Sequence, residues 1–156
     1  MFCGAGISKP AGLPLFDELV SLIYKALGDS PTDLEQGELN KDNYDRVLNL
    51  IESRFGGKLV RQKVKEIHTP CSNPFLDTHH SILALAREKS GHIHLVTTNF
   101  DLLFEMADSQ VPKTGAPLLP VPKPTKWNQL VYLHGRLGDE IEEQHLVLTS
   151  GDFGIA

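Results

Sequence analysis

Three short segments of the sequence combine polar side chains with tight turns that could hold a nucleotide. The first is the run Gly4-Ala5-Gly6-Ile7-Ser8. Two glycines spaced this way after a strand let the backbone approach a pyrophosphate closely, with N–H groups and a helix start facing the anion. The third glycine of the dinucleotide fingerprint would stand at Lys9, so a dehydrogenase-type site is not expected. The alternative for this run is a tight turn without a ligand.

The second segment is Thr97-Thr98-Asn99-Phe100-Asp101, which ends a run that predicts a buried strand. Ligands of open α/β sheets bind outside the carboxyl ends of the strands. Asn99 offers both a donor and an acceptor, and Asp101 offers a carboxylate. The alternative is structural, because either side chain could cap a helix that begins at Leu102.

The third segment, Tyr132-Leu133-His134-Gly135-Arg136, lies at the end of another predicted strand. His134 could act as a general base near neutral pH, and Gly135 would let a ligand or another loop come close. His92 and His94 alternate along one strand, but no third ligand stands at a suitable spacing, so no metal site is expected. We interpret all histidines except His134 as ordinary core or surface groups: His68, His79, His80, His92, His94 and His145.

The helices that must position these segments follow from the spacing of apolar residues. A 3.6-residue period predicts helices at residues 14–27, 43–55, 58–68, 78–87 and 102–107. Thr78 is the predicted cap of the fourth helix, and Gly28 is the predicted end of the first. Residues 29–42 are polar and turn-rich, residues 69–77 contain two prolines, and both are predicted loops.

Short β-branched and apolar runs predict strands at residues 92–98, 130–134 and 146–149, and Met1-Phe2-Cys3 is interpreted as the end of another. Prolines at positions 112, 117, 120, 122 and 124 exclude a regular element from residues 111–126, apart from a short extended piece at 116–119. Strands that alternate with helices indicate the α/β class, here a Rossmann-like parallel sheet with flanking helices.

Length and composition predict a globular domain of a reducing cytoplasm. The chain has 156 residues, of which 40% are hydrophobic and 22% charged. Its net charge of −5 supplies no basic face for nucleic acid, and no apolar run is long enough for a membrane span. Cys3 and Cys71 cannot form a four-cysteine zinc site, and no signal peptide is visible. The abrupt ends predict that residues 1–156 are one domain of a longer chain, incomplete at both ends.

Taken in order, these segments resemble the sirtuin family of NAD-consuming enzymes. The glycine run, followed by Gly12-Leu13-Pro14 and Phe16, is similar to the family's opening pattern of glycines, Ile-Ser, Gly-Ile-Pro and Phe. The second segment resembles its Thr-Gln-Asn-Ile-Asp signature, and His134-Gly135 resembles its catalytic His-Gly pair. The likeness spans residues 4–135, and the family's later nucleotide-binding strands have no counterpart in this sequence.

Two departures separate the chain from the deacylases of that family. The deacylases usually have Asp-Phe-Arg after Gly-Ile-Pro, whereas this chain has Leu15-Phe16-Asp17. They also have a four-cysteine zinc module after His-Gly, whereas no cysteine follows Cys71. The chain is more similar to the divergent, zinc-free bacterial sirtuin-like domains of antiphage defence proteins, which hydrolyse NAD. Residues 146–153 are similar to them as well.

The resemblance implies an NAD⁺ hydrolase without zinc that cleaves the nicotinamide–ribose bond. Asn99 would orient the water or the ribose hydroxyls, Asp101 would support the loop or the ribose, and His134 would act as the base. It further implies a C-terminal partner domain in the parent chain and assembly into homo-oligomers. Phe16 would cover the nicotinamide side. The implied NAD-binding residues are Gly4, Ala5, Gly6, Ile7, Ser8, Phe16, Thr98 and Gly135.

Two other functions stay open at the level of sequence. A protein deacylase or ADP-ribosyl transferase could use the same site, but a peptide channel normally needs the zinc module that this chain lacks. A non-catalytic module that binds NAD or ADP-ribose would show the same motifs, and it would bind the nucleotide without consuming it.

Overall fold

The computed structural model describes residues 1–116, 118–119, 127–138 and 143–153. The chain folds into two compact units, each built from two pieces of sequence. The first unit comprises Met1–Leu13 and Pro70–Leu146, and the second comprises Pro14–Thr69 and Val147–Ala156. No helix in the described part of the chain is long and apolar enough to cross a membrane.

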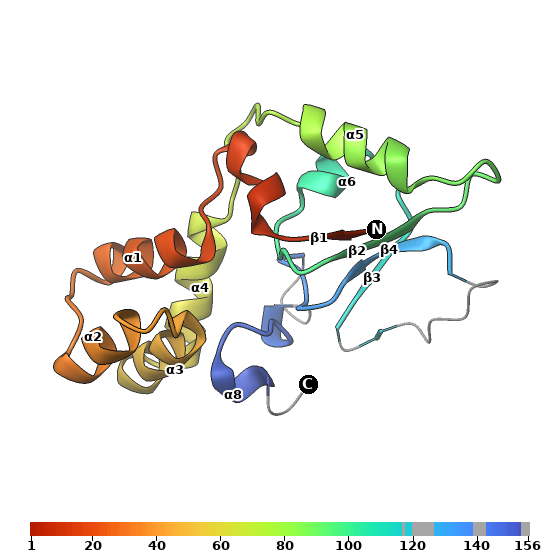
Figure 1. Cartoon of the computed structure of the whole chain (residues 1–156). Coiled ribbons are helices and arrows are strands. Elements are labelled where there is room, and N and C mark those ends of the chain that lie inside the picture. The colour runs from red at the N-terminus through yellow and green to blue at the C-terminus, as the bar shows by residue number, and fades with distance from the viewer. Residues whose placement is uncertain (117, 120–126, 139–142, 154–156) are drawn as a thin grey trace. The chain divides into compact units, whose positions relative to one another are not determined.

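The first unit contains a four-stranded parallel sheet (Figure 1). Its strands are β1 (Phe2–Cys3), β2 (His94–Thr97), β3 (Lys113–Gly115) and β4 (Gln129–Tyr132), in the order β1-β2-β4-β3. The last residues of all four strands share one register, since Cys3 pairs with Thr97, Thr97 with Tyr132, and Gly115 with Tyr132. Every segment that leaves a strand at this edge therefore begins at the same level. The predicted α/β class and parallel sheet are confirmed.

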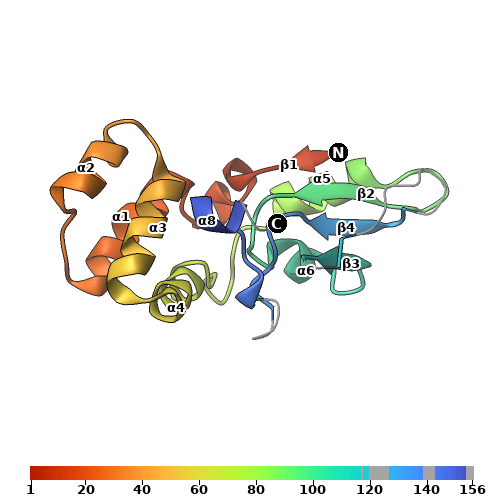
Figure 2. The ribbon, with the colours of Figure 1, turned by 90° about the horizontal axis from the view of Figure 1, so that it is seen from below.

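The core of this unit lies between the sheet and two helices, α5 (Asp77–Ala86) and α6 (Leu103–Ala107). Both helices lie on the same side of the sheet, as Figure 1 and the view from below in Figure 2 show. The cluster between them is formed by Cys3, Leu83, Ala86, Ile93, Leu95, Phe104, Val111, Leu130 and Tyr132. Burial of these apolar side chains is the main force that holds β2 and β4 against the helices.

The second unit is helical. Its elements are α1 (Phe16–Leu27), α2 (Asp33–Leu39), α3 (Tyr44–Phe55), α4 (Gly57–Ile67) and α8 (Ser150–Phe153). The apolar residues at helical spacing are its buried residues, among them Leu19, Ile23, Val47, Ile51 and Val64. Helix α1 ends at Gly28 in the left-handed region with φ 67°, a conformation that glycine adopts without strain. The predicted helices at 14–27, 43–55 and 58–68 are confirmed, with small differences at their ends.

Helix α2 was not expected, because residues 29–42 were predicted as a loop. Its first turn is a capping box, in which Thr32 Oγ1 accepts from the Glu35 amide and Glu35 Oε2 accepts from the Thr32 amide. The carboxylate of Glu35 is buried and receives a hydrogen bond of 2.7 Å from Arg54 Nη1 of α3. Burial acts to raise the pKa of Glu35, but the bonds from Arg54 and Thr32 outweigh it and lower the pKa below its usual value.

The strand predicted at residues 146–149 is wrong. Leu146 and Leu148 are buried as expected, but the amides of Leu148 and Thr149 both donate to Asp152 Oδ2 at 2.9 Å. Thr149 Oγ1 in turn accepts from the Asp152 amide, so these groups cap α8 instead of joining a sheet.

Two further expectations are corrected. The exclusion of a regular element from residues 111–126 outside 116–119 is wrong, because β3 occupies Lys113–Gly115 and pairs with β4, whereas the described part of 116–119 is not a strand. A turn follows β3, since the Leu118 amide donates to the Gly115 carbonyl. Thr78 is not a helix cap, because α5 begins one residue before it. The prolines at 117, 120, 122 and 124 lie outside the described residues.

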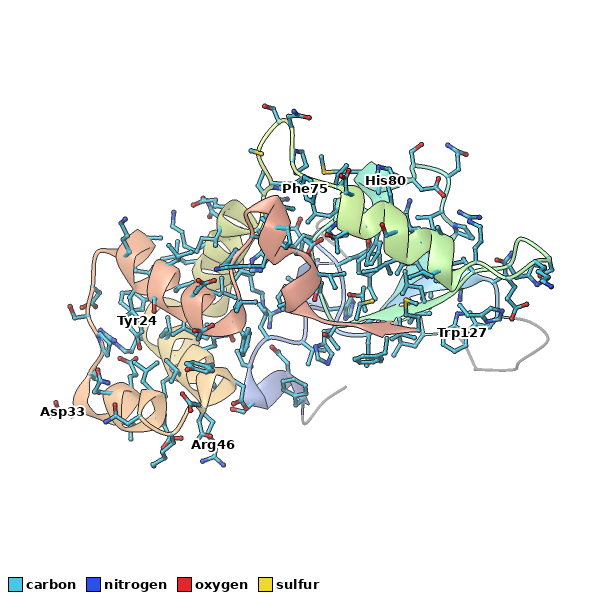
Figure 3. All side chains as sticks on the ribbon, turned by 45° about the horizontal axis from the view of Figure 1, so that its top comes forward. Tyr24, Asp33, Arg46, Phe75, His80 and Trp127 are labelled. Atoms are coloured by element: carbon cyan, nitrogen blue, oxygen red, sulfur yellow. The ribbon has the colours of Figure 1, made fainter. Side chains whose placement is uncertain are left out.

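Replacing Arg54 by Met should destabilise the protein, because the charge of Glu35 would stay buried without its main partner. We expect the free energy of unfolding to fall by about 2–3 kcal/mol, measured by urea unfolding. Arg46→Met is the matched control, since the side chain of Arg46 is exposed and faces away from the helices (Figure 3), and its contact with Glu38 is longer, at 3.6 Å. The control should lose no more than about 0.5 kcal/mol. Equal losses in both variants would contradict the role of Arg54.

Candidate functional site

The three segments singled out in the sequence meet at the carboxyl edge of the sheet in the first unit. The amide of Thr98 donates to the carbonyl of Cys3, and the amide of Leu133 donates to the carbonyl of Thr97, at 3.1 and 2.8 Å. After Cys3 the chain turns through two short 3₁₀ helices, η1 (Ala5–Ile7) and η2 (Lys9–Ala11). The glycine run, the Asn99 segment and the His134 segment therefore leave three neighbouring strands at one level.

A buried hydrogen-bonded group, here named the Ser8 cluster, lies between the first two segments. It consists of Ser8, His79, Asn99 and Asp101, with exposed fractions of 2%, 0%, 7% and 3%. Ser8 Oγ donates to Asp101 Oδ2 at 2.8 Å and accepts from Asn99 Nδ2 at 3.0 Å. His79 Nε2 lies 3.5 Å from the same Oγ. One hydroxyl therefore connects all three other members.

The number of protons on Ser8 determines the state of His79. A hydroxyl has one proton to donate, and Ser8 directs it to Oδ2 of Asp101, which accepts that hydrogen bond. The contact of 3.5 Å is then a hydrogen bond only if Nε2 of His79 carries the proton and donates it to Ser8. Burial lowers the pKa of His79 below its usual 6.5, although the carboxylate of Asp101 acts in the opposite direction. The contact and the lowered pKa both favour a neutral imidazole with its proton on Nε2.

This arrangement is not the triad of a serine hydrolase. In such a triad the histidine takes the proton of the serine, and the carboxylate binds the other ring nitrogen of the histidine. Here Asp101 binds Ser8 instead, and Nδ1 of His79 has no hydrogen-bond partner among the described residues. Ser8 is thus an organising group and not a nucleophile.

Two acceptor atoms of the cluster are buried without a partner in the described part of the chain: Oδ1 of Asn99 and Nδ1 of His79. Because Nδ2 of Asn99 is bound to Ser8, its Oδ1 is the end of the amide that stays available. A buried acceptor without a partner costs free energy, so such atoms are rare and need an explanation, such as a water or a bound ligand.

The sequence left open whether Asn99 and Asp101 cap a helix or bind a ligand, and the two residues differ in this respect. Oδ1 of Asp101 accepts from the amide of Leu103, the first residue of α6, although the N-cap position itself is Leu102. Its other oxygen binds Ser8, and both oxygens are engaged inside the protein. Asn99 uses its own amide on Thr97 Oγ1 and its side chain on Ser8. Neither residue is the N-cap of α6, but the carboxylate of Asp101 does bind the first amide of that helix.

The glycine run forms a 3₁₀ turn that is stabilised by its own backbone. The amide of Ile7 donates to Gly4, and the amide of Ser8 donates to Ala5. Gly4 has an extended backbone, and a Cβ there would lie 3.5 Å from Thr98 Oγ1, which is an ordinary contact. Gly6 is exposed, with open space where a Cβ would stand. The turn itself needs neither glycine, and a missing side chain at this edge leaves the backbone accessible.

His134 and Gly135 follow β4 on the same edge. His134 is half-buried, and burial lowers the pKa of its imidazole below the usual 6.5. Gly135 has φ 81°, and a Cβ there would stand 2.9 Å from the carbonyl oxygen of His145. Of the two reasons considered for this glycine, the close approach of another segment is the one that the structure shows.

Phe16 is not grouped with the other predicted site residues. It is the first residue of α1 in the helical unit, and its ring packs edge-to-face on Tyr44 of the same unit, with 6.3 Å between ring centres. The structure therefore brings Ser8, Asn99 and Asp101 together, places Thr98 and the His134 segment just after the ends of adjacent strands, and leaves Phe16 in a different unit.

His79 is the cluster member that the sequence analysis missed. It was interpreted as an ordinary histidine, next to the similar His80. A signal was present, because position 79 shares the apolar face of α5 with Leu83 and Ala86, whereas His80 is exposed on the outer side of the helix (Figure 3). A polar ring on the buried face of a helix needs a partner, and Ser8 provides it.

The described residues contain no group of three His, Cys, Asp or Glu side chains that could hold a metal ion. Cys3 and Cys71 are both free thiols, the first buried and the second exposed. Burial raises the pKa of Cys3, which keeps that thiol protonated near neutral pH. The chemistry available at the edge is therefore that of amide, carboxylate, hydroxyl and imidazole groups.

The fold and the edge together define a Rossmann-like α/β domain with a buried polar cluster where the strands end. The sequence matches no protein-family model. It is similar to the protein of Sinorhizobium fredii (strain NBRC 101917 / NGR234) described as uncharacterized protein y4cA, with 33% identity over 167 residues. The match covers 99% of this chain and 14% of that protein, so the chain spans about one seventh of its relative's length.

Replacing Gly135 by Ala should destabilise the first unit for two reasons, a positive φ and a clash with the His145 carbonyl. We expect a loss of about 2–4 kcal/mol in urea unfolding. Gly91→Ala is the matched control, because Gly91 has a similar φ of 86° but open space where a Cβ would stand. The control should lose only about 1 kcal/mol. If both variants lose the same amount, the close approach at His145 is not the cause.

The two depressed histidine pKa values make the stability of the first unit depend on pH. Above the usual pKa of 6.5, His79 and His134 are neutral in both the folded and the unfolded chain. Below it, the unfolded chain binds protons more readily, so the free energy of unfolding should fall as pH decreases from about 7.5 to about 5.5. The slope should be smaller in His134→Gln, measured by urea unfolding at several pH values. An unchanged slope in that variant would contradict the depressed pKa.

Proposed function

We propose that the protein is an NAD⁺ glycohydrolase, which cleaves the nicotinamide–ribose bond to release nicotinamide and ADP-ribose. The observation that supports it most is the side chain of Asn99. Its nitrogen is held by Ser8, and its oxygen is buried without a partner among the described residues, at the edge where ligands of parallel α/β sheets bind. Oδ1 of Asn99 can therefore accept a hydrogen bond from a hydroxyl group or from a water.

The reaction does not need a strong general acid from the protein. The bond breaks through an oxocarbenium-like state, as in other glycoside cleavages, and its electrons pass to the ring nitrogen, so nicotinamide leaves as a neutral molecule. A water oxygen then bonds to the ribose carbon, and the water gives up a proton. The site must therefore hold the ribose, place the water and accept one proton, and positioning alone can contribute several kcal/mol.

Each member of the edge then has one task. Asn99 orients the water or the ribose hydroxyls through Oδ1. Asp101 acts through Ser8, because both of its oxygens are already engaged. His134 accepts the proton, and its lowered pKa favours the neutral form that a base requires.

The glycine run is the proposed contact for the phosphates of NAD⁺. The amides of Ile7 and Ser8 are used inside the turn, so the backbone of Gly4, Ala5 and Gly6 would face the anion. Thr98, beside Gly4, would line the same side, and Gly135 would shape the loop that carries His134. The contact of Phe16 with nicotinamide stays a prediction, as do NAD⁺ as the substrate and the absence of zinc.

The biological role and the partners are inferred from the resemblance to sirtuin-like domains, and they are part of the same proposal as the activity. The relative is about seven times as long as the matched region. This length agrees with a domain that works beside other domains in a longer chain. Antiphage defence, a C-terminal partner domain, homo-oligomers and a cytoplasmic location belong to this proposal. So does the absence of direct nucleic-acid binding, which the net charge of −5 supports.

The test is nicotinamide release from NAD⁺ by the full-length protein, followed by chromatography. Asn99→Ala and His134→Ala should each lower kcat about 100-fold or more, because one removes the positioned oxygen and the other the base. The controls are Asn73→Ala and His80→Ala, which change exposed residues of the same unit and should keep wild-type activity. Urea unfolding of each variant checks that the loss is not a loss of fold.

Wild-type rates in both Asn99→Ala and His134→Ala would refute these assignments. Binding of NAD⁺ or ADP-ribose by the wild-type protein without any consumption would instead favour the non-catalytic module. A transfer of ADP-ribose to protein, seen with labelled NAD⁺, would favour the transferase.

A further inference from the structure

We propose that His79 is a positioning residue of the site: its Nε2–H holds the hydroxyl of Ser8 and thereby fixes which end of the Asn99 amide faces the substrate. The proposal rests on the proposed function, because it assigns a task within the same site. His79 lies outside the three sequence segments that carry the resemblance.

The first step is the fixed direction of three hydrogen bonds at one oxygen. Ser8 Oγ has one proton and two lone pairs. The hydroxyl donates its one hydrogen bond to Oδ2 of Asp101 at 2.8 Å, and one lone pair accepts from Asn99 Nδ2 at 3.0 Å. The second lone pair is available to His79 Nε2, which lies 3.5 Å away. With all three directions occupied, the hydroxyl cannot rotate without losing a bond inside the protein.

The second step is the fixed tautomer of His79. The ring is fully buried in α5, and it packs edge-to-face on Phe104 of α6 with 4.9 Å between ring centres. With the proton on Nδ1 instead, a buried N–H would have no acceptor among the described residues. Nε2 would then also compete with Asp101 for the single proton of Ser8. Both effects favour the Nε2–H form.

The third step is the orientation of Asn99. If its amide were rotated by 180°, Oδ1 would face the Oγ of Ser8, whose only proton is already engaged in the hydrogen bond to Asp101. Two acceptors, Oδ1 of Asn99 and Oγ of Ser8, would then face each other without a proton between them. The hydroxyl therefore selects the orientation with Nδ2 inward. Oδ1 is left as the end that can receive a hydrogen bond from a ribose hydroxyl or a water.

Two substitutions of the same residue separate positioning from packing. The amide nitrogen of Gln can stand where Nε2 stands, so His79→Gln keeps a donor toward Ser8. The amide of Asn is one bond shorter and places its nitrogen near the position of Nδ1. We expect kcat for nicotinamide release to fall less than about 3-fold in His79→Gln and about 10-fold or more in His79→Asn, with KM changed much less. His80→Asn, on the exposed side of α5, should keep the wild-type kcat.

A second measurement needs neither NAD⁺ nor activity. Nitrogen NMR of the wild-type protein at neutral pH should show His79 neutral, with the proton on Nε2. The side-chain amide protons of Asn99 should exchange slowly in the wild type and in His79→Gln, and faster in His79→Asn. A proton on Nδ1, or the same exchange rate in both variants, would overturn the proposal.

The two measurements distinguish the possible failures. If the wild type releases no nicotinamide, the proposed function fails, and the NMR result alone decides whether His79 orients Asn99. If the wild type is active and the Gln and Asn variants have equal kcat, the role of His79 is refuted and the proposed function stands.

Discussion

The hydroxyl of Ser8 is the interaction on which the candidate site depends. It joins His79, Asn99 and Asp101, which lie 71, 91 and 93 residues away in the sequence. A buried polar group must find partners, and a chain of such groups is either complete or costly. Because the oxygen has one proton and two lone pairs, three bonds satisfy it fully and leave Asn99 Oδ1 as the acceptor that the network does not use.

The Ser8 cluster is possible because the sheet brings its segments to one level. Cys3, Thr97, Tyr132 and Gly115 end their strands in a common register, and the apolar core between the sheet and α5 and α6 maintains it. Helix α5 contributes His79 from the face that packs on this core. Core packing and site geometry are therefore coupled, since a shift of α5 would move the donor away from Ser8.

Several residues serve the fold and the proposed chemistry together. Asp101 accepts from the first amide of α6 with one oxygen and binds Ser8 with the other, and Gly135 lets the segment at His145 pack beside the loop of His134. Such double use explains why a structural interpretation and a functional one could both be given for the same motif. For Asp101 the two are compatible, and the proposed task of the carboxylate is to support the cluster.

The sequence by itself determined most helices, the parallel α/β class and the edge where Ser8, Asn99 and Asp101 meet, because apolar spacing and strand ends are local signals. The capping pairs of α2 and α8, Thr32 with Glu35 and Thr149 with Asp152, are three residues apart, so they were local signals that the prediction of a loop and of a strand overlooked. The tertiary structure alone decided the partners of Glu35 and His79, because Arg54 and Ser8 are distant in the sequence and meet them only in the folded chain. Local patterns show which residue could bind, whereas the packing of distant segments decides what it binds.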